Sequence, residues 1–115
     1  MGKLNVLAIT ACISGVAHTY MAAERLEKLA SQENWQIKVE TQGALGIENP
    51  FTDEEIKAAD VVIIISNTNV KKQERYEGCR RLKMDISQFL IRPEAITTNL
   101  KKVLNAPKGT CLQVV

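Results

Sequence analysis

Aromatic residues and an excess of positive charge are both scarce in this chain of 115 residues. Aromatic side chains make up 4% of it, and 15 Lys and Arg stand against 13 Asp and Glu. The sequence therefore has neither the basic surplus of a nucleic-acid-binding protein nor the stacking rings of a single-strand binder. We expect no nucleic acid partner.

Long hydrophobic runs are also missing. The longest candidate runs only from Val61 to Ile65, whereas about 20 apolar residues are needed to cross a bilayer. The N-terminus, Met1-Gly2-Lys3-Leu4, lacks the apolar core and the small-residue cleavage site of a secretory signal. These absences predict a cytoplasmic protein.

Cysteine occurs only three times, which is an odd number. Cys12, Cys79 and Cys111 lie too far apart for the C-x-x-C pairs of redox or zinc sites. We therefore expect reduced thiols, and a cysteine with a special role must owe that role to its surroundings.

The length is close to the common size of one domain, and such a chain buries roughly two-thirds of its unfolded surface. We expect residues 1–115 to form a single domain. This size does not suit a large multidomain enzyme.

Apolar runs alternate with amphipathic segments along the chain. The runs at 4–9 and 61–65 are typical of strands that are buried on both faces of a parallel sheet. Alternating residues at 36–41 predict a half-exposed edge strand, and 82–86 predicts a weaker fourth strand. The predicted helices cover 17–30, 53–59, 71–77 and 93–104, and the tail from 108 is expected to be frayed.

This alternation predicts an α/β fold of three layers, αβα, with a four-stranded parallel sheet that is Rossmann-like and has right-handed crossovers. We expect the strands to lie in the order 2-1-3-4. In such sheets, ligands bind beyond the carboxyl ends of the strands, where the winding reverses. The loops after the first and third predicted strands, at 10–16 and 66–70, are therefore the places to look for a site.

The first of these loops carries a cysteine between a strand and a helix. Backbone N–H groups at a helix N-terminus can surround phosphoryl oxygens, and the helix dipole adds roughly half a positive charge there. The same field favours the thiolate form of Cys12. Cys12 is therefore the candidate nucleophile, and the candidate phosphoryl-binding loop consists of Ile13, Ser14, Gly15, Val16, Ala17 and His18.

Each of these assignments has a structural alternative. Cys12 could be a buried, inert cysteine, as free cysteines often are. His18, the sole histidine, could cap or pack locally instead of taking part in catalysis. The hydroxyls of Thr10, Ser14 and Thr19 could donate to a phosphoryl group or serve only in caps and turns.

A phosphatase loop of the Cys-x5-Arg type also uses backbone amides, but it adds an arginine that stabilises the transition state. In this chain His18 occupies the position of that arginine. The loop therefore suits a protein that holds a phosphoryl group and passes it to another acceptor. Two alternatives stay open at this point: a hydrolase similar to low-molecular-weight tyrosine phosphatases, and a regulatory or nucleotide-binding module in which Cys12 is a bystander.

The residues from Thr10 to Glu24 read Thr-Ala-Cys-x-x-Gly-x-Ala-His-Thr-x-Met-Ala-Ala-Glu. This motif resembles the fructose-type IIB components of the bacterial phosphoenolpyruvate-dependent sugar phosphotransferase system. Four further segments, 39–43, 46–49, 58–62 and 74–78, look like that family in the same order. The resemblance covers nearly the whole chain.

The resemblance implies a phosphorelay. A phosphohistidine on a IIA domain would donate to Cys12, which would pass the phosphoryl group to a sugar, fructose or fructose-like, bound by the membrane IIC component. The protein would then be a sugar phosphotransferase with a phosphocysteine intermediate, cytoplasmic and peripherally associated with IIC. This scheme needs no metal or organic cofactor.

Two loops depart from the family pattern. The family loop usually reads Cys-Pro-Thr-Gly, where this chain has Ile13 and Ser14. Ser14 keeps the hydroxyl, and Ile13 restores the backbone N–H that proline lacks. The loop at 66–69 is also richer in amides than the acidic version in the family.

Overall fold

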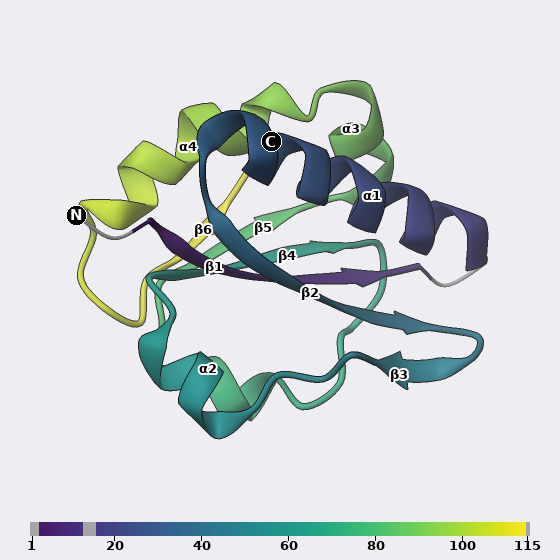
Figure 1. Cartoon of the computed structure of the whole chain (residues 1–115), viewed down its shortest axis with the longest axis horizontal. Helices are drawn as coiled ribbons and strands as arrows, with labels where there is room; N and C mark the ends of the chain where they lie inside the picture. The colour runs from purple at the N-terminus through teal and green to yellow at the C-terminus, as the bar shows by residue number, and fades with distance from the viewer. Residues whose placement is uncertain (1–2, 13–15, 115) are drawn as a thin grey trace.

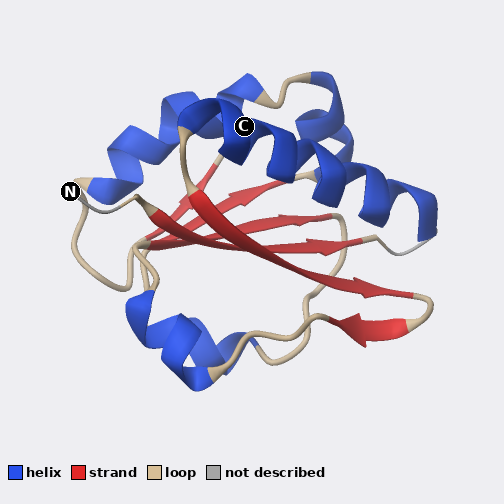
Figure 2. Cartoon of the chain, viewed as in Figure 1, coloured by secondary structure: helices blue, strands red, loops and turns tan. Residues whose placement is uncertain are grey.

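The structure, a computed structural model, describes residues 3–12 and 16–114 of the chain. A twisted sheet lies between two layers of helices (Figure 1, Figure 2). The elements follow one another as β1 (Asn5–Ala11), α1 (Val16–Glu33), β2 (Gln36–Gly43), β3 (Gly46–Glu48), α2 (Asp53–Ala58), β4 (Val61–Ser66), the 3-10 helix η1 (Gln73–Tyr76), β5 (Arg81–Met84), α3 (Ile86–Ile91), α4 (Glu94–Leu104) and β6 (Cys111–Gln113).

The sheet has six strands in the order β3-β2-β1-β4-β5-β6. The prediction of a four-stranded sheet is therefore wrong in number and in overall order, although the four predicted strands occupy its centre as β2, β1, β4 and β5. The sheet is also not wholly parallel, because β3 pairs with β2 in the antiparallel sense. The two missed strands are each three residues long, too short to show the alternation by which strands are recognised.

The edge strand β3 comes from a tight hairpin. Gly43 on β2 pairs with Gly46 on β3, so the chain reverses between these two residues. Gly46 has a φ of +91°, a conformation that L side chains adopt only with strain and glycine adopts freely.

The C-terminal tail is ordered as far as Val114, so the prediction that it frays from Lys108 is wrong. Strand β6 pairs in parallel with β5, the N–H of Val114 donates to the carbonyl of Lys83 at 2.8 Å, and the Val114 side chain is buried. The edge of β5 supplies the backbone hydrogen bonds that hold β6. The local sequence of the tail does not predict this pairing.

Between β4 and α4, two of the predicted elements differ from the structure. The helix expected at 71–77 is a single 3-10 turn, η1. The strand expected at 82–86 ends at Met84, because the carboxylate of Asp85 accepts from the N–H groups of Ser87 and Gln88 and starts α3. Helix α3 was not predicted, whereas α1, α2 and α4 begin and end within a few residues of their predicted limits.

Both faces of the sheet are covered by side chains and helices. Val6, Ala8 and Cys12 on β1 and just after it belong to the core under α1, α3 and α4, whereas Leu7, Ile9 and Ala11 belong to the core on the side of α2 and η1. This explains the unbroken apolar run of β4, since each fully buried aliphatic side chain contributes roughly 1.5–3 kcal/mol. The three layers that the sequence predicts are present (Figure 1).

The helices of the described residues are short or amphipathic. None of those within 3–12 and 16–114 combines the length and apolar character that crossing a membrane demands.

Candidate functional site

Cys12 follows directly after the last residue of β1, at the edge of the sheet where the parallel strands end. Its side chain is only 7% exposed and belongs to the core beneath α1. The next described element is α1, which begins at Val16. Cys12 therefore lies between a strand end and a helix start, where the sequence analysis expects it.

The predicted loop residues fall into two groups. Ile13, Ser14 and Gly15 lie outside the described residues. Val16 opens α1, and Ala17 and His18 follow it with exposed side chains. The helix is 18 residues long and has no acidic side chain in its first turn, so nothing in that turn offsets the positive end of its dipole.

The three hydroxyl residues of the motif have different surroundings. Thr10 and Thr19 are fully buried, and Ser14 lies outside the described residues. The hydroxyl of Thr10 has no hydrogen-bond partner within 3–12 and 16–114. Thr19 faces the end of β2, where its Oγ1 lies 3.8 Å from the position that a Cβ on Gly43 would occupy. The side chain of Thr19 therefore packs between α1 and the end of β2.

A second segment reaches Cys12 from the neighbouring strand β4. Ser66 is in register with Ala11, and the N–H of Asn67 donates to the carbonyl of Ala11 at 3.3 Å. The side-chain amide of Asn67 donates to the sulfur of Cys12, with 3.6 Å between Nδ2 and Sγ. Sequence reasoning pointed to the loop but not to this residue, whose signal is its place one step beyond the end of the strand beside β1.

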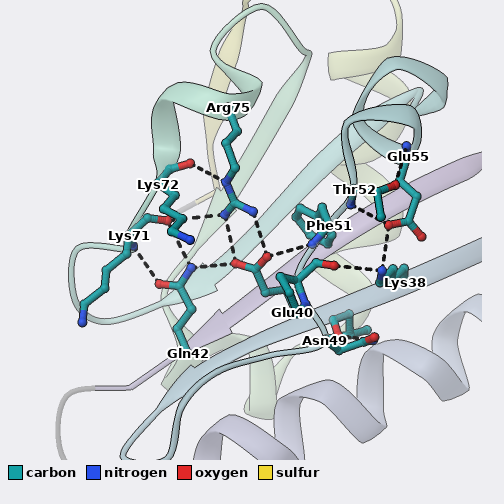
Figure 3. A network of polar contacts seen from close by, with 12 residues as sticks. Lys38, Glu40, Gln42, Asn49, Phe51, Thr52, Glu55, Lys71, Lys72 and Arg75 are labelled. Carbon is teal, nitrogen blue, oxygen red and sulfur yellow. Dashed lines mark hydrogen bonds and ion pairs between the residues drawn. The ribbon is translucent and has the colours of Figure 1, made fainter.

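A buried carboxylate on β2 organises the segment that continues from Asn67 (Figure 3). Glu40 is fully buried. Arg75 donates to both of its oxygens, at 2.9 and 3.0 Å, Gln42 donates at 2.7 Å, and the N–H of Phe51 donates at 3.1 Å. Burial on its own raises the pKa of Glu40, but these hydrogen bonds outweigh it and hold the pKa below the ordinary value.

Gln42 and Arg75 also bind the backbone after β4. Gln42 accepts from the N–H of Lys71 at 2.7 Å and donates to its carbonyl at 3.1 Å. Arg75 donates through Nε to the carbonyl of Lys72 at 2.8 Å, a residue that has a positive φ of 62°. The guanidinium lies 5.6 Å from the ring centres of both Phe51 and Tyr76. We call Glu40, Gln42 and Arg75 the β2 clamp.

The β2 clamp was not predicted from the sequence, because Glu40 lies on the polar side of an alternating strand. Alternation predicts that such a side chain faces solvent. The layer of α2 and η1 covers it instead, and Arg75 is 35 residues away in the chain.

These observations agree with the comparison to known proteins. The family model described as "PTS system, Lactose/Cellobiose specific IIB subunit" matches residues 7–105. The chain belongs to this IIB family. The resemblance found in the sequence is therefore confirmed.

Individual relatives of this IIB chain carry fructose-related names. It is 50% identical over 107 residues to "PTS system fructose-like EIIB component 3" of Escherichia coli (strain K12), with 93% of this chain and 95% of that protein covered. It is 48% identical over 82 residues to "PTS system fructose-specific EIIB'BC component" of Xanthomonas campestris pv. campestris, covering 71% of this chain and 14% of that protein.

A solved structure gives the same result. The structure described as "Crystal Structure of Predicted Fructose Specific IIB from Escherichia Coli" superimposes with a TM-score of 0.90 at 49% identity, and the match covers 96% of this chain and 97% of that one. As a IIB component, the chain is a sugar phosphotransferase that accepts a phosphoryl group and passes it to a sugar bound by IIC. Family membership thus decides against a hydrolase and against a regulatory or nucleotide-binding module.

Proposed function

We propose that Cys12 is the residue that carries the phosphoryl group. It accepts the group from a phosphohistidine on a IIA domain and passes it to fructose or a fructose-like sugar bound by the membrane IIC component. One observation carries the assignment: Cys12 lies at the carboxyl edge of the sheet, directly before the start of α1, with an amide donor 3.6 Å from its sulfur. A strand end followed by a helix start is a favourable place for an anion.

In the first step, an electron pair of the Cys12 thiolate forms the S–P bond. The N–P bond of the phosphohistidine breaks, and its electron pair stays on the imidazole nitrogen of the donor. The backbone N–H groups of Ile13, Ser14, Gly15, Val16, Ala17 and His18 surround the phosphoryl oxygens, and the dipole of α1 favours the negative charge that they carry. Positioning of the two reacting groups in line also lowers the barrier to transfer.

In the second step, a hydroxyl oxygen of the sugar attacks the phosphorus. The O–P bond forms while the S–P bond breaks, its electron pair returns to sulfur, and the sugar hydroxyl gives up its proton to water. This second step regenerates the thiolate, and neither step needs a metal or an organic cofactor.

Both partners must reach the same sulfur, so IIA and IIC use this edge of the sheet in turn. A fused relative supports the pairing with IIC, because its name joins B and C components in one protein. We propose that this chain is cytoplasmic and meets the membrane through IIC. The fructose-related names of the relatives are the basis for the sugar class.

The test is the intact mass of the protein after incubation with a phosphorylated IIA donor. We expect one added phosphoryl group on the wild type, none on Cys12→Ser, and undiminished labelling of Cys79→Ser and Cys111→Ser, because these two cysteines lie elsewhere in the fold. Labelling of Cys12→Ser at the wild-type rate contradicts the proposal.

A further inference from the structure

Two hydrogen bonds of one residue, Asn67, join the segment after β4 to the end of β1 and to Cys12. The N–H of Asn67 holds the carbonyl of Ala11 at 3.3 Å, which joins the segment to the end of β1. Its side-chain amide lies against the residue that follows β1, with Nδ2 3.6 Å from the sulfur of Cys12. A thiolate accepts such a hydrogen bond more strongly than a neutral thiol, because hydrogen bonds to a charged group are the stronger ones.

We propose that Asn67 is a further catalytic residue of the phosphotransfer site. Its amide donates to the thiolate of Cys12 before transfer and to an oxygen of the phosphoryl group after it. No proton is transferred, since the N–H changes its acceptor as the S–P bond forms and the donor's N–P bond breaks. The inference rests on the proposed role of Cys12.

The charge and burial of the two residues suit this role. Asn67 is neutral, so it can donate to a phosphoryl oxygen without bringing a second negative charge toward it. Cys12 is only 7% exposed, so water has little access to replace a lost donor at its sulfur. Asn67 itself has an exposed side chain, so its replacement leaves both apolar cores intact.

The position of Asn67 is held from both sides of its segment. On one side, Ser66 pairs with Ala11 in the sheet. On the other, Val70 is buried and both backbone groups of Lys71 are bound by Gln42 of the β2 clamp (Figure 3). A short stretch of chain fixed at both ends limits where the amide of Asn67 can point, and such preorganisation is what transition-state stabilisation requires. The residues of the clamp act through Asn67 and are positioning residues.

The first measurement is the rate at which iodoacetamide alkylates Cys12, followed by mass spectrometry of its peptide across a pH series. In Asn67→Ala we expect alkylation roughly tenfold slower below the pH at which the thiol ionises, the size expected for one lost hydrogen bond to a charged group. The rate at high pH, where the thiol is fully ionised, should not fall. Asn67→Leu, which keeps the number and branching of the side-chain heavy atoms but has no donor, should behave in the same way.

The second measurement is the rate of phosphorylation by a phosphorylated IIA donor, which we expect to fall roughly tenfold in both variants. Asn69→Ala is the matched control, an exposed asparagine in the same segment, and should lose less than about twofold. Circular dichroism establishes that every variant is folded.

The outcomes separate this inference from the proposed function. If the wild type is not phosphorylated on Cys12, the proposed function fails, whatever the variants do. Suppose that the wild type is phosphorylated on Cys12. If Asn67→Ala then matches it in the rate of phosphorylation, or in the rate of alkylation below the pH at which the thiol ionises, Asn67 is not catalytic and the inference is overturned. A loss in Asn69→Ala equal to that in Asn67→Ala overturns it as well, because the effect then belongs to the segment and not to the amide.

Discussion

On one face of the sheet, α1, α3 and α4 pack mainly through aliphatic and aromatic side chains, such as Leu26, Phe89 and Ile96. On the other face, a smaller apolar core around Phe51 and Tyr76 adjoins the fully buried carboxylate of Glu40. The first layer depends on volume and pattern, which many sequences satisfy. The second depends on one set of partners, because a buried charge is tolerated only when it is paired and hydrogen-bonded.

The candidate site lies where these two layers meet. The sulfur of Cys12 belongs to the apolar face under α1, while Asn67 belongs to the segment that the β2 clamp holds on the other side. The contrast therefore bears on function. Substitutions in the β2 clamp should slow phosphorylation of Cys12, whereas conservative substitutions in the apolar layer should not.

The largest expected effect comes from Arg75→Ala, which leaves the carboxylate of Glu40 buried without its ion-pair partner. We expect the free energy of unfolding to fall by about 3 kcal/mol, measured by urea denaturation. Arg25→Ala, on the exposed side of α1, is the control and should change it by less than about 0.5 kcal/mol. Equal losses in the two variants would show that the charge pair is of no importance.

Glu40→Gln keeps the shape of the side chain and removes its charge. We expect a loss of about 2 kcal/mol at neutral pH, because hydrogen bonds to a charged group become neutral ones. The pKa of Glu40 in the folded protein lies below the ordinary 4.5, so its contribution is complete above that pH and is lost as the pH falls through the lower folded value.

The difference between wild type and Glu40→Gln should therefore shrink below pH 4.5, followed by urea denaturation at several pH values. Glu24→Gln, at an exposed position on α1, is the matched control for the change of charge. If the difference in unfolding free energy stayed constant to the lowest pH at which both proteins are folded, the stability would not depend on the ionisation of Glu40.

Phe89→Leu tests the apolar face through the same two quantities, the free energy of unfolding and the rate of phosphorylation. Phe89 is a fully buried residue of α3, but a smaller apolar side chain can be accommodated by repacking, so we expect a loss of about 1 kcal/mol. The rate of phosphorylation should remain within about twofold of the wild type. If this variant lost as much stability as Arg75→Ala, the two layers would not differ in the way described.

A similarly small effect on stability is expected for Gln42→Ala, which frees the backbone of Lys71 and removes one donor from Glu40. We expect about 1 kcal/mol of destabilisation. Phosphorylation of Cys12 should nevertheless become roughly threefold slower, because Asn67 loses the support of its segment. Gln88→Ala, at an exposed position on α3, provides the comparison, and a similar slowing there would argue against a positioning role.

Local pattern was sufficient to predict the central strands and most helices. The run from Val61 to Ile65 can be buried on both faces only in the middle of a sheet, and Thr52 forms the capping box that starts α2. Strands β3 and β6 were missed because three residues carry no period and their pairing depends on the edges of β2 and β5.

The site divides in the same way. The place of Cys12 between a strand end and a helix start could be inferred because both signals lie within the same few residues. The contact of Cys12 with Asn67 joins residues 55 positions apart, and the pair of Glu40 and Arg75 joins residues 35 apart. Contacts between residues so far apart cannot be predicted from a short window of local sequence.

By itself, then, the sequence determined the α/β layers, the family and the cysteine at the end of the first strand, because these follow from periodicity and from a contiguous motif. Only the tertiary structure decided that Asn67 lies against that sulfur and that Glu40 is buried with Arg75. A parallel sheet brings the ends of distant strands to one edge, and the layer that covers it sets which polar side chains lose their water.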